Sequence, residues 1–150
     1  MSDRVTESIR RAVAARSCGY CEYCRCSEKF ATQSFTVEHI KPRKAGGENG
    51  LENLAWSCFG CNAHKHTKTE AIDSETQEKI ALFNPRQQAW SDNFNWNNDF
   101  TQVIGKTPSG RVTVESLRLN RVGVVNLRRL LFAANLHPPE KVGLSDLDSI

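Results

Sequence analysis

The sequence lacks a long apolar run. No stretch approaches the roughly 18 apolar residues that a membrane-spanning helix requires, and the N-terminal residues lack the apolar segment of a signal peptide. Internal repeats, low-complexity blocks and a clear linker are absent as well. We therefore expect a soluble cytoplasmic protein without a membrane partner, organised as a single domain over residues 1–150, because this length is near the usual size of one domain.

Net charge is also small. The formal charge is +3 and the isoelectric point is near 8.6, which do not by themselves assign a polyanionic partner. The charge is unevenly spread: residues 1–69 hold eleven Lys and Arg against seven Asp and Glu, a net of +4, which leaves about −1 for residues 70–150. The positive charge therefore accompanies the motifs described next, as either a surface for a polyanion or a solvated basic face.

Six cysteines stand in a chain without a recognisable secretion signal. In that setting, paired Cys-x-x-Cys spacing favours metal thiolates over disulfides. The two pairs comprise Cys21, Cys24, Cys58 and Cys61. Four thiolates satisfy tetrahedral Zn²⁺ without an open position, so we expect a structural zinc that supplies folding free energy. Cys18 also forms a Cys-x-x-Cys pair with Cys21, but we favour the pairs named first and expect Cys18 and Cys26 to be free or buried thiols.

The first half of the chain has the patterns of short secondary-structure elements. Residues 3–16 carry apolar positions at spacings of three and four, which predicts an amphipathic helix. Residues 35–40 and 54–57 predict two strands separated by a Pro- and Gly-containing loop, and residues 59–67 predict a short helix. We therefore expect an α+β fold with a small zinc-stapled core in the order strand, loop, strand, helix.

Residues 70–140 carry weaker patterns, and we expect a mostly helical and irregular C-terminal extension there. The aromatic and Asn-rich residues 90–100 predict irregular structure. Thr107 and Pro108 predict a helix start, with Thr as the cap and Pro in the first turn. A second helix is predicted from the apolar stripe Leu127, Leu130, Leu131 and Ala134. Residues 141–150 are expected to be poorly ordered.

A second group of polar residues suggests a site for chemistry. Asn62 and His66 stand four residues apart on the expected helix and so project from one of its faces. A strand end that delivers Glu38 and His39 opposite this face gathers a carboxylate, an amide oxygen and imidazole around one point. Such donors suit a hard divalent ion, Mg²⁺ or Mn²⁺. His39 then stays off the metal, where a neutral imidazole can accept a proton near physiological pH.

This group has the parts that phosphodiester hydrolysis needs. His39 can activate a water, while a metal held by Glu38, Asn62 and His66 stabilises the charge that develops at phosphorus and at the leaving oxygen. Cationic side chains that can neutralise flanking phosphates are Lys41, Arg43, Lys44 and Lys65. Structural alternatives stay open: a satisfied structural histidine at His39, a solvated strand residue at Glu38 and solvated charge at the cations.

Two other kinds of zinc protein fail on residue spacing. A Cys₂His₂ finger needs a second His three to five residues after the first, and none follows His39 at that spacing. A zinc-dependent nucleobase deaminase needs a His-x-Glu signature and a Pro before the second cysteine pair. Here Lys41 stands two residues after His39, and Ser57 precedes Cys58.

At these residues the sequence resembles the HNH endonuclease family, whose ββα-metal motif has this order of elements. The block Val-Glu-His-Ile-Lys-Pro is similar to the first family block, with His39 as the first His. The stretch from Gly46 to Leu54 resembles the family loop, with Asn53 as its Asn. Cys58 to His66 resembles the last block of the zinc-bearing members. The resemblance covers about residues 16–69.

The resemblance implies a role for each matching residue. Glu38 and Asn62 would ligate the catalytic metal, His39 would activate water, and Asn53 would brace the loop that orients His39. His66 would contact the metal or a phosphate. Two positions depart from the family pattern: Asp is commoner at the position of Glu38, and Gly frequently follows the Lys of the last block, where His66 stands.

The implied activity is that of a divalent-metal-dependent endonuclease that cleaves DNA to a 5′-phosphate and a 3′-hydroxyl. Double-stranded DNA is the favoured partner, with RNA and single strands left open. One alternative is a non-catalytic zinc-ribbon module that binds nucleic acid or protein. Another is a nuclease active only within a larger assembly, with residues 70–150 as the surface for a protein partner.

Overall fold

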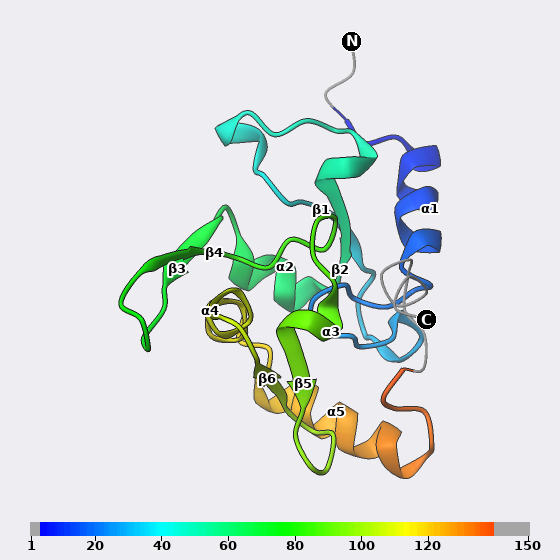
Figure 1. Cartoon of the computed structure of the whole chain (residues 1–150). Coiled ribbons are helices and arrows are strands. Elements are labelled where there is room, and N and C mark those ends of the chain that lie inside the picture. The colour runs from blue at the N-terminus through cyan, green and yellow to red at the C-terminus, as the bar shows by residue number, and fades with distance from the viewer. Residues whose placement is uncertain (1–3, 140–150) are drawn as a thin grey trace.

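The computed structural model describes residues 4–139 (Figure 1). The expectation for residues 141–150 lies outside the described residues. Within them the fold is α+β, with helices connected to three separate two-stranded antiparallel sheets. The α+β class predicted from the sequence is confirmed.

A β-hairpin followed by a helix forms the centre of the N-terminal half. β1 (Thr36–His39) pairs with β2 (Leu54–Ser57), so that Thr36 lies opposite Ser57 and His39 lies opposite Leu54. The connecting loop contains two short 3₁₀ turns, η2 (Arg43–Ala45) and η3 (Leu51–Asn53). α2 (Phe59–Lys65) follows β2 directly. The predicted order of strand, loop, strand and helix is confirmed, with element ends shifted by two residues at most.

α1 (Glu7–Arg16) packs against this hairpin. It begins later than predicted because Thr6 caps it: the Thr6 hydroxyl accepts a hydrogen bond from the Ile9 amide, which satisfies a donor at the helix start. Two arginines tie the helix to the rest of the core. Arg10 donates to the Phe35 carbonyl at 2.9 Å, and Arg16 donates to the carbonyls of Leu51 and Leu54 at 2.9 and 2.5 Å. A 3₁₀ turn, η1 (Glu28–Phe30), precedes β1.

The C-terminal extension contains more strand than the sequence predicted. β3 (Glu70–Ile72) pairs with β4 (Lys79–Ala81), and β5 (Phe94–Trp96) pairs with β6 (Val103–Gly105). α3 (Trp90–Asn93) leads directly into β5, so the prediction of irregular structure for residues 90–100 is wrong over its first seven residues.

The two helices predicted near the end of the extension are present. α4 (Pro108–Ser116) starts as expected, with Pro108 in its first turn and the Thr107 hydroxyl accepting from the Gly110 amide. α5 (Val122–Ala133) buries Val124, Arg128 and Leu131. Leu130, which was placed in the apolar stripe, is 70% exposed, so the buried face differs from the predicted one.

One apolar core joins the two halves of the chain. Its buried side chains run from Val13 in α1 to Leu119 beyond α4. Tyr23 lies edge-on to Phe83 with 6.4 Å between ring centroids, and Phe83 lies edge-on to Phe94 at 5.2 Å. The cysteine-rich segment therefore packs directly on the extension. None of the helices between residues 4 and 139 combines the length and the apolarity needed to span a bilayer.

Candidate metal centre and active site

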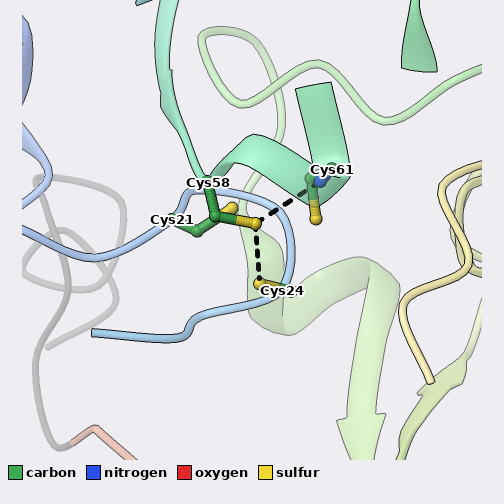
Figure 2. Close-up of side chains that lie close together, drawn as sticks. All are labelled: Cys21, Cys24, Cys58 and Cys61. Carbon is green, nitrogen blue, oxygen red and sulfur yellow. Dashed lines mark hydrogen bonds between the residues drawn. The ribbon is translucent and has the colours of Figure 1, made fainter. Parts of the chain in front are cut away.

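The four paired cysteines meet at one buried point. The sulfur atoms of Cys21, Cys24, Cys58 and Cys61 all lie within 4.8 Å of one another. The first two come from the loop after α1 and the last two from the start of α2, as Figure 2 shows. The sulfur atoms of Cys24 and Cys58 are 3.7 Å apart. Zinc–sulfur bonds of 2.3 Å in a tetrahedron place the sulfurs about 3.8 Å apart, so the cluster fits a structural zinc.

The local backbone explains how these sulfurs converge. The first pair lies in a tight turn, where the Arg25 amide donates to the Cys21 carbonyl at 3.0 Å and the Cys21 amide donates to the Cys26 carbonyl at 2.9 Å. The second pair straddles a helix start: Cys58 is the N-cap of α2, and its sulfur accepts from the Cys61 amide at 3.4 Å. We call residues 21–26 the zinc knuckle.

Protonation of the clustered thiols is strongly altered. Burial raises the pKa of Cys21, whereas hydrogen bonds from neighbouring thiols, that of Cys21 first, lower the pKa of Cys58. The cluster therefore cannot hold four thiolates without a cation. The remaining two cysteines lie outside it: Cys18 is exposed, while the sulfur of Cys26 is 3.3 Å from that of Cys24.

Glu38 is buried and hydrogen-bonded through both carboxylate oxygens. It is 3% exposed, and Oε1 accepts from the Tyr23 hydroxyl at 2.5 Å while Oε2 accepts from Lys65 Nζ at 2.7 Å. Burial raises the pKa of Glu38, and the Lys65 ammonium opposes that rise. Glu38 is therefore not a solvated strand residue, and its role as a metal ligand stays a prediction.

Lys65 likewise does not face the surface as a phosphate contact would. It is 1% exposed, and its ammonium also donates to the backbone carbonyls of His39 and Ile40 at 3.4 and 3.0 Å. These bonds explain why a lysine is buried here, since each proton has an acceptor. Together with Glu38, Lys65 fixes the end of β1 where His39 is carried.

His39 lies on the other side of the strand and is half-buried. Successive side chains of a strand point to opposite faces, so Glu38 turns inward while His39 reaches the connecting loop. There His39 Nε2 lies 2.7 Å from the side-chain oxygen of Asn49. An amide oxygen only accepts hydrogen bonds, so this contact requires Nε2 as the donor, and in the neutral ring with that tautomer Nδ1 is the nitrogen that can accept a proton. The ring is thereby oriented as a proton acceptor through Nδ1.

Asn53 holds the loop closed. Its side-chain oxygen accepts from the Lys41 amide at 2.9 Å, and its amide nitrogen donates to the carbonyls of Lys41 and Glu48 at 3.0 and 2.9 Å. The loop is so tight that a Cβ on Gly47 would lie 1.8 Å from the Lys41 carbonyl oxygen. Asn53 thus makes the contacts of a brace for the loop that carries Asn49.

Asn62 lies in α2, and His66 is the C-cap of that helix. α2 ends at Lys65, two residues earlier than predicted, and His66 has φ 51° and ψ −123°. The His66 amide still donates to the Asn62 carbonyl at 2.9 Å. Asn62 is half-buried, whereas His66 is exposed. Binding of Mg²⁺ or Mn²⁺ by Glu38, Asn62 and His66 stays a prediction.

The other expected phosphate contacts, Lys41, Arg43 and Lys44, are exposed on the loop after β1. Two adjoining cavities of about 680 and 390 Å³ lie beside this loop, and their linings share Ile40, Lys41, Asn84 and Gln87. They form a groove between the β1–β2 loop and the extension. Lys41 therefore belongs to a concave surface next to the loop that orients His39.

Three contributors to these sites were not predicted from the sequence: Tyr23, Asn49 and Arg121. Arg121 donates to the sulfurs of Cys58 and Cys61. Tyr23 could have been found from its position between two zinc cysteines. For Asn49 the sequence offered only an Asn-Gly turn. Arg121 carried no local signal, because its partners lie about 60 residues earlier in the chain.

Comparison with known families agrees with this geometry. Residues 21–68 match the family model described as HNH endonuclease. The matched segment begins at the first zinc cysteine and includes the hairpin, its loop and α2, and the four clustered cysteines are consistent with the zinc-binding members of that family. No curated protein and no solved structure matches the chain.

Proposed function

We propose that the protein is an endonuclease that hydrolyses DNA phosphodiester bonds, with His39 as the general base. The observation that carries the proposal is the His39 ring, held by Asn49 with its Nδ1 lone pair available, inside a segment that matches the HNH family. General-base catalysis requires a neutral imidazole aimed at a water, and the Asn49 contact supplies the orientation.

Substrate contacts in this proposal come from the loop after β1. Lys41, Arg43 and Lys44 present three cationic side chains at the surface next to the groove. Phosphate neutralisation by such residues positions a strand without reading its sequence. A requirement for Mg²⁺ or Mn²⁺ stays a prediction from the family resemblance. Glu38, Asn62 and His66 are the residues that would hold the ion, and at Glu38 it would compete with the Lys65 ammonium.

The test is a cleavage assay on the purified full chain with supercoiled plasmid, single-stranded DNA and RNA. Each substrate is incubated with Mg²⁺, with Mn²⁺ and with a chelator, and zinc content is measured throughout. We expect plasmid cleavage that His39→Ala lowers by about 10²- to 10⁴-fold. His64→Ala is the matched control, since His64 also lies in the HNH segment but outside the group of expected catalytic residues.

The buried ion pair between Glu38 and Lys65 favours a second candidate, a non-catalytic zinc module that binds nucleic acid. In that protein the carboxylate would serve only to hold Lys65 and the end of β1. Zinc-replete protein that binds DNA but cleaves no substrate with any ion would support this candidate and end the nuclease proposal.

A further inference from the structure

The turn between α4 and α5 brings a cation from the extension to the cysteine cluster. Arg121 donates from Nη2 to the sulfur of Cys58 at 3.3 Å and to that of Cys61 at 3.7 Å, and from Nη1 to Cys61 at 3.6 Å. The same guanidinium is fixed by the carbonyls of Leu117 and Arg118 at 3.3 and 3.0 Å. Its position is therefore set by the extension, not by the HNH segment.

The first turn of α2 leaves room for this contact. A Cβ on Gly60 would lie 2.5 Å from Nη2 of Arg121 and 2.8 Å from its Nε and Cζ. Any larger residue at position 60 would have to move the guanidinium away from the sulfurs. The HNH segment and the extension are thus complementary at this point.

The negative charge of a zinc centre with four thiolates explains why a contact with Arg121 is favourable. Zn²⁺ with four thiolates carries a net charge of −2, and this charge is buried. Buried charge is costly unless it is paired and hydrogen-bonded. The Cys61 amide supplies one donor to Cys58, and Arg121 supplies donors to both Cys58 and Cys61 together with a positive charge.

We propose that Arg121 is the outer-shell partner of the zinc centre and determines how firmly the zinc is retained. The hydrogen bonds and positive charge of the guanidinium offset the buried negative charge of the two thiolates, so zinc bound to them is released less readily. The proposal rests on the zinc assignment alone. It stands or falls independently of nuclease activity.

Arg128 also contacts the cysteine-rich segment, but its role differs from that of Arg121. It is 2% exposed and donates to the carbonyls of Cys24, Leu119 and Thr101 at 3.3, 2.8 and 2.9 Å. It therefore ties the backbone of the zinc knuckle to the extension without touching a ligand sulfur. Arg121 is the cation that reaches the thiolates themselves.

The experiment measures transfer of zinc from the full chain to the chromogenic chelator 4-(2-pyridylazo)resorcinol. Loss of an outer-shell partner typically weakens metal binding 10- to 100-fold, and we expect Arg121→Ala to release zinc at least about tenfold faster than the unaltered chain. The control is Arg129→Ala, because Arg129 is an exposed arginine of α5 whose guanidinium donates to the side chain of Asn126. That variant should release zinc at the unaltered rate.

Gly60→Ala tests the same contact without removing the arginine. Alanine is more favourable than glycine inside a helix. If the contact of Arg121 with the sulfurs had no effect on zinc retention, Gly60→Ala would therefore release zinc at the unaltered rate or more slowly. We expect faster release, and no further increase when Gly60→Ala is combined with Arg121→Ala, because both remove one contact. An unaltered rate in Arg121→Ala overturns the proposal. If that variant does not fold with zinc, an unaltered or slower rate in Gly60→Ala overturns it.

Discussion

Asn49 is the residue on which the orientation of His39 depends. Its side-chain oxygen lies 2.7 Å from His39 Nε2, and a ring without this contact can rotate or take the other tautomer. We expect Asn49→Ala to lower the cleavage rate about tenfold, the equivalent of one hydrogen bond of about 1.4 kcal/mol. The fold should persist, since Asn49 is on a loop. Equal rates for Asn49→Ala and the unaltered chain would remove His39 from the proposed role.

Asn49→Asp tests the same contact through pH. A carboxylate at this position accepts from Nε2 as the amide does, but its negative charge also favours the protonated imidazole. A base must be neutral to accept a proton, so the acid limb of the pH–rate profile should move to higher pH. The measurement is cleavage rate against pH for both proteins, and an unmoved acid limb contradicts the assignment.

His66 occupies a backbone conformation that suits glycine. Its φ of 51° with ψ of −123° is rarely adopted by residues with a side chain and costs on the order of 1–3 kcal/mol. Glycine adopts it without a steric penalty. This backbone conformation gives a physical reason why the HNH family, which the sequence resembles, frequently has Gly at this position.

We therefore expect His66→Gly to raise the free energy of unfolding by about 1 kcal/mol, after the greater flexibility of glycine in the unfolded chain is allowed for. Urea unfolding measures this change. Cleavage by the same variant separates two roles for His66: retained activity means a strained helix end, and activity lost from a more stable protein means a functional side chain. His66→Ala is the matched control, because alanine removes the imidazole but keeps the strain.

At the scale of elements, the ion pair of Arg111 with Asp73 joins the β3–β4 hairpin to α4. Arg111 donates to both carboxylate oxygens of Asp73 at 3.1 and 2.9 Å, and the Thr76 amide adds a bond at 3.2 Å. These hydrogen bonds, those of Arg111 first, hold the pKa of Asp73 well below its ordinary value. The folded protein therefore stabilises the ionised form.

Acid should remove this contribution. Because the pKa of Asp73 is lower in the folded than in the unfolded chain, the pair stabilises the fold above about pH 4, and this stabilisation declines as the pH falls below that value. We expect Asp73→Asn to unfold at lower urea concentration at pH 7, and the gap to the unaltered chain to narrow at pH 3. Glu75→Gln is the control, since Glu75 also contacts Arg111 but is largely exposed. A gap that widens on acidification would contradict the assignment.

The elements that sequence predicted are those with strong local signals. The strands 36–39 and 54–57 follow β-branched and aromatic runs, and α4 follows the Thr107 cap. Strands β3 to β6 have three residues each, too short for an alternating pattern. The buried face of α5 was missed for another reason: Arg128 lies in it, and arginine is mostly exposed unless it is paired, as Arg128 is through both Nη atoms.

The candidate site was predictable to a similar degree. Cysteine spacing fixed the metal centre, because thiolate pairs from a turn and a helix start have few other uses. For the second site, the sequence placed Glu38 and His39 at a strand end but did not reveal the partners of Glu38, because Tyr23 and Lys65 come from other parts of the chain. Nothing in the local pattern marked the end of α2 before His66.

At the scale of the whole molecule, the extension holds the zinc knuckle at several points. Trp90 donates from its indole to the Tyr23 carbonyl at 2.9 Å, Arg86 forms an ion pair with Glu22, and Arg128 reaches the Cys24 carbonyl. Each contact ends on a zinc-ligand cysteine of the knuckle or on a residue between its two ligands. Residues 70–139 thus contact the zinc knuckle within the chain, and docking of a protein partner on their remaining surface stays a prediction.

Loss of zinc should consequently loosen the extension as well as the HNH segment. Metal binding supplies folding free energy to a site that the apo chain cannot hold together, and the knuckle contacts of the extension require that site. We expect Cys58→Ser to lower the free energy of unfolding by several kcal/mol. Cys18→Ser should leave it unchanged, because Cys18 is exposed and outside the cluster.

Hydrogen exchange with and without zinc locates the effect. If the two halves form one cooperative unit, amides of α3, β5 and α5 lose protection together with those of β2 and α2 when zinc is removed. The physical reason is that Trp90 and Arg128 lose the fixed carbonyls of Tyr23 and Cys24, and the buried guanidinium of Arg128 is then left with an unmatched donor. Protection that survives in residues 90–133 while residues 21–61 exchange freely would instead show an extension that folds without the metal centre.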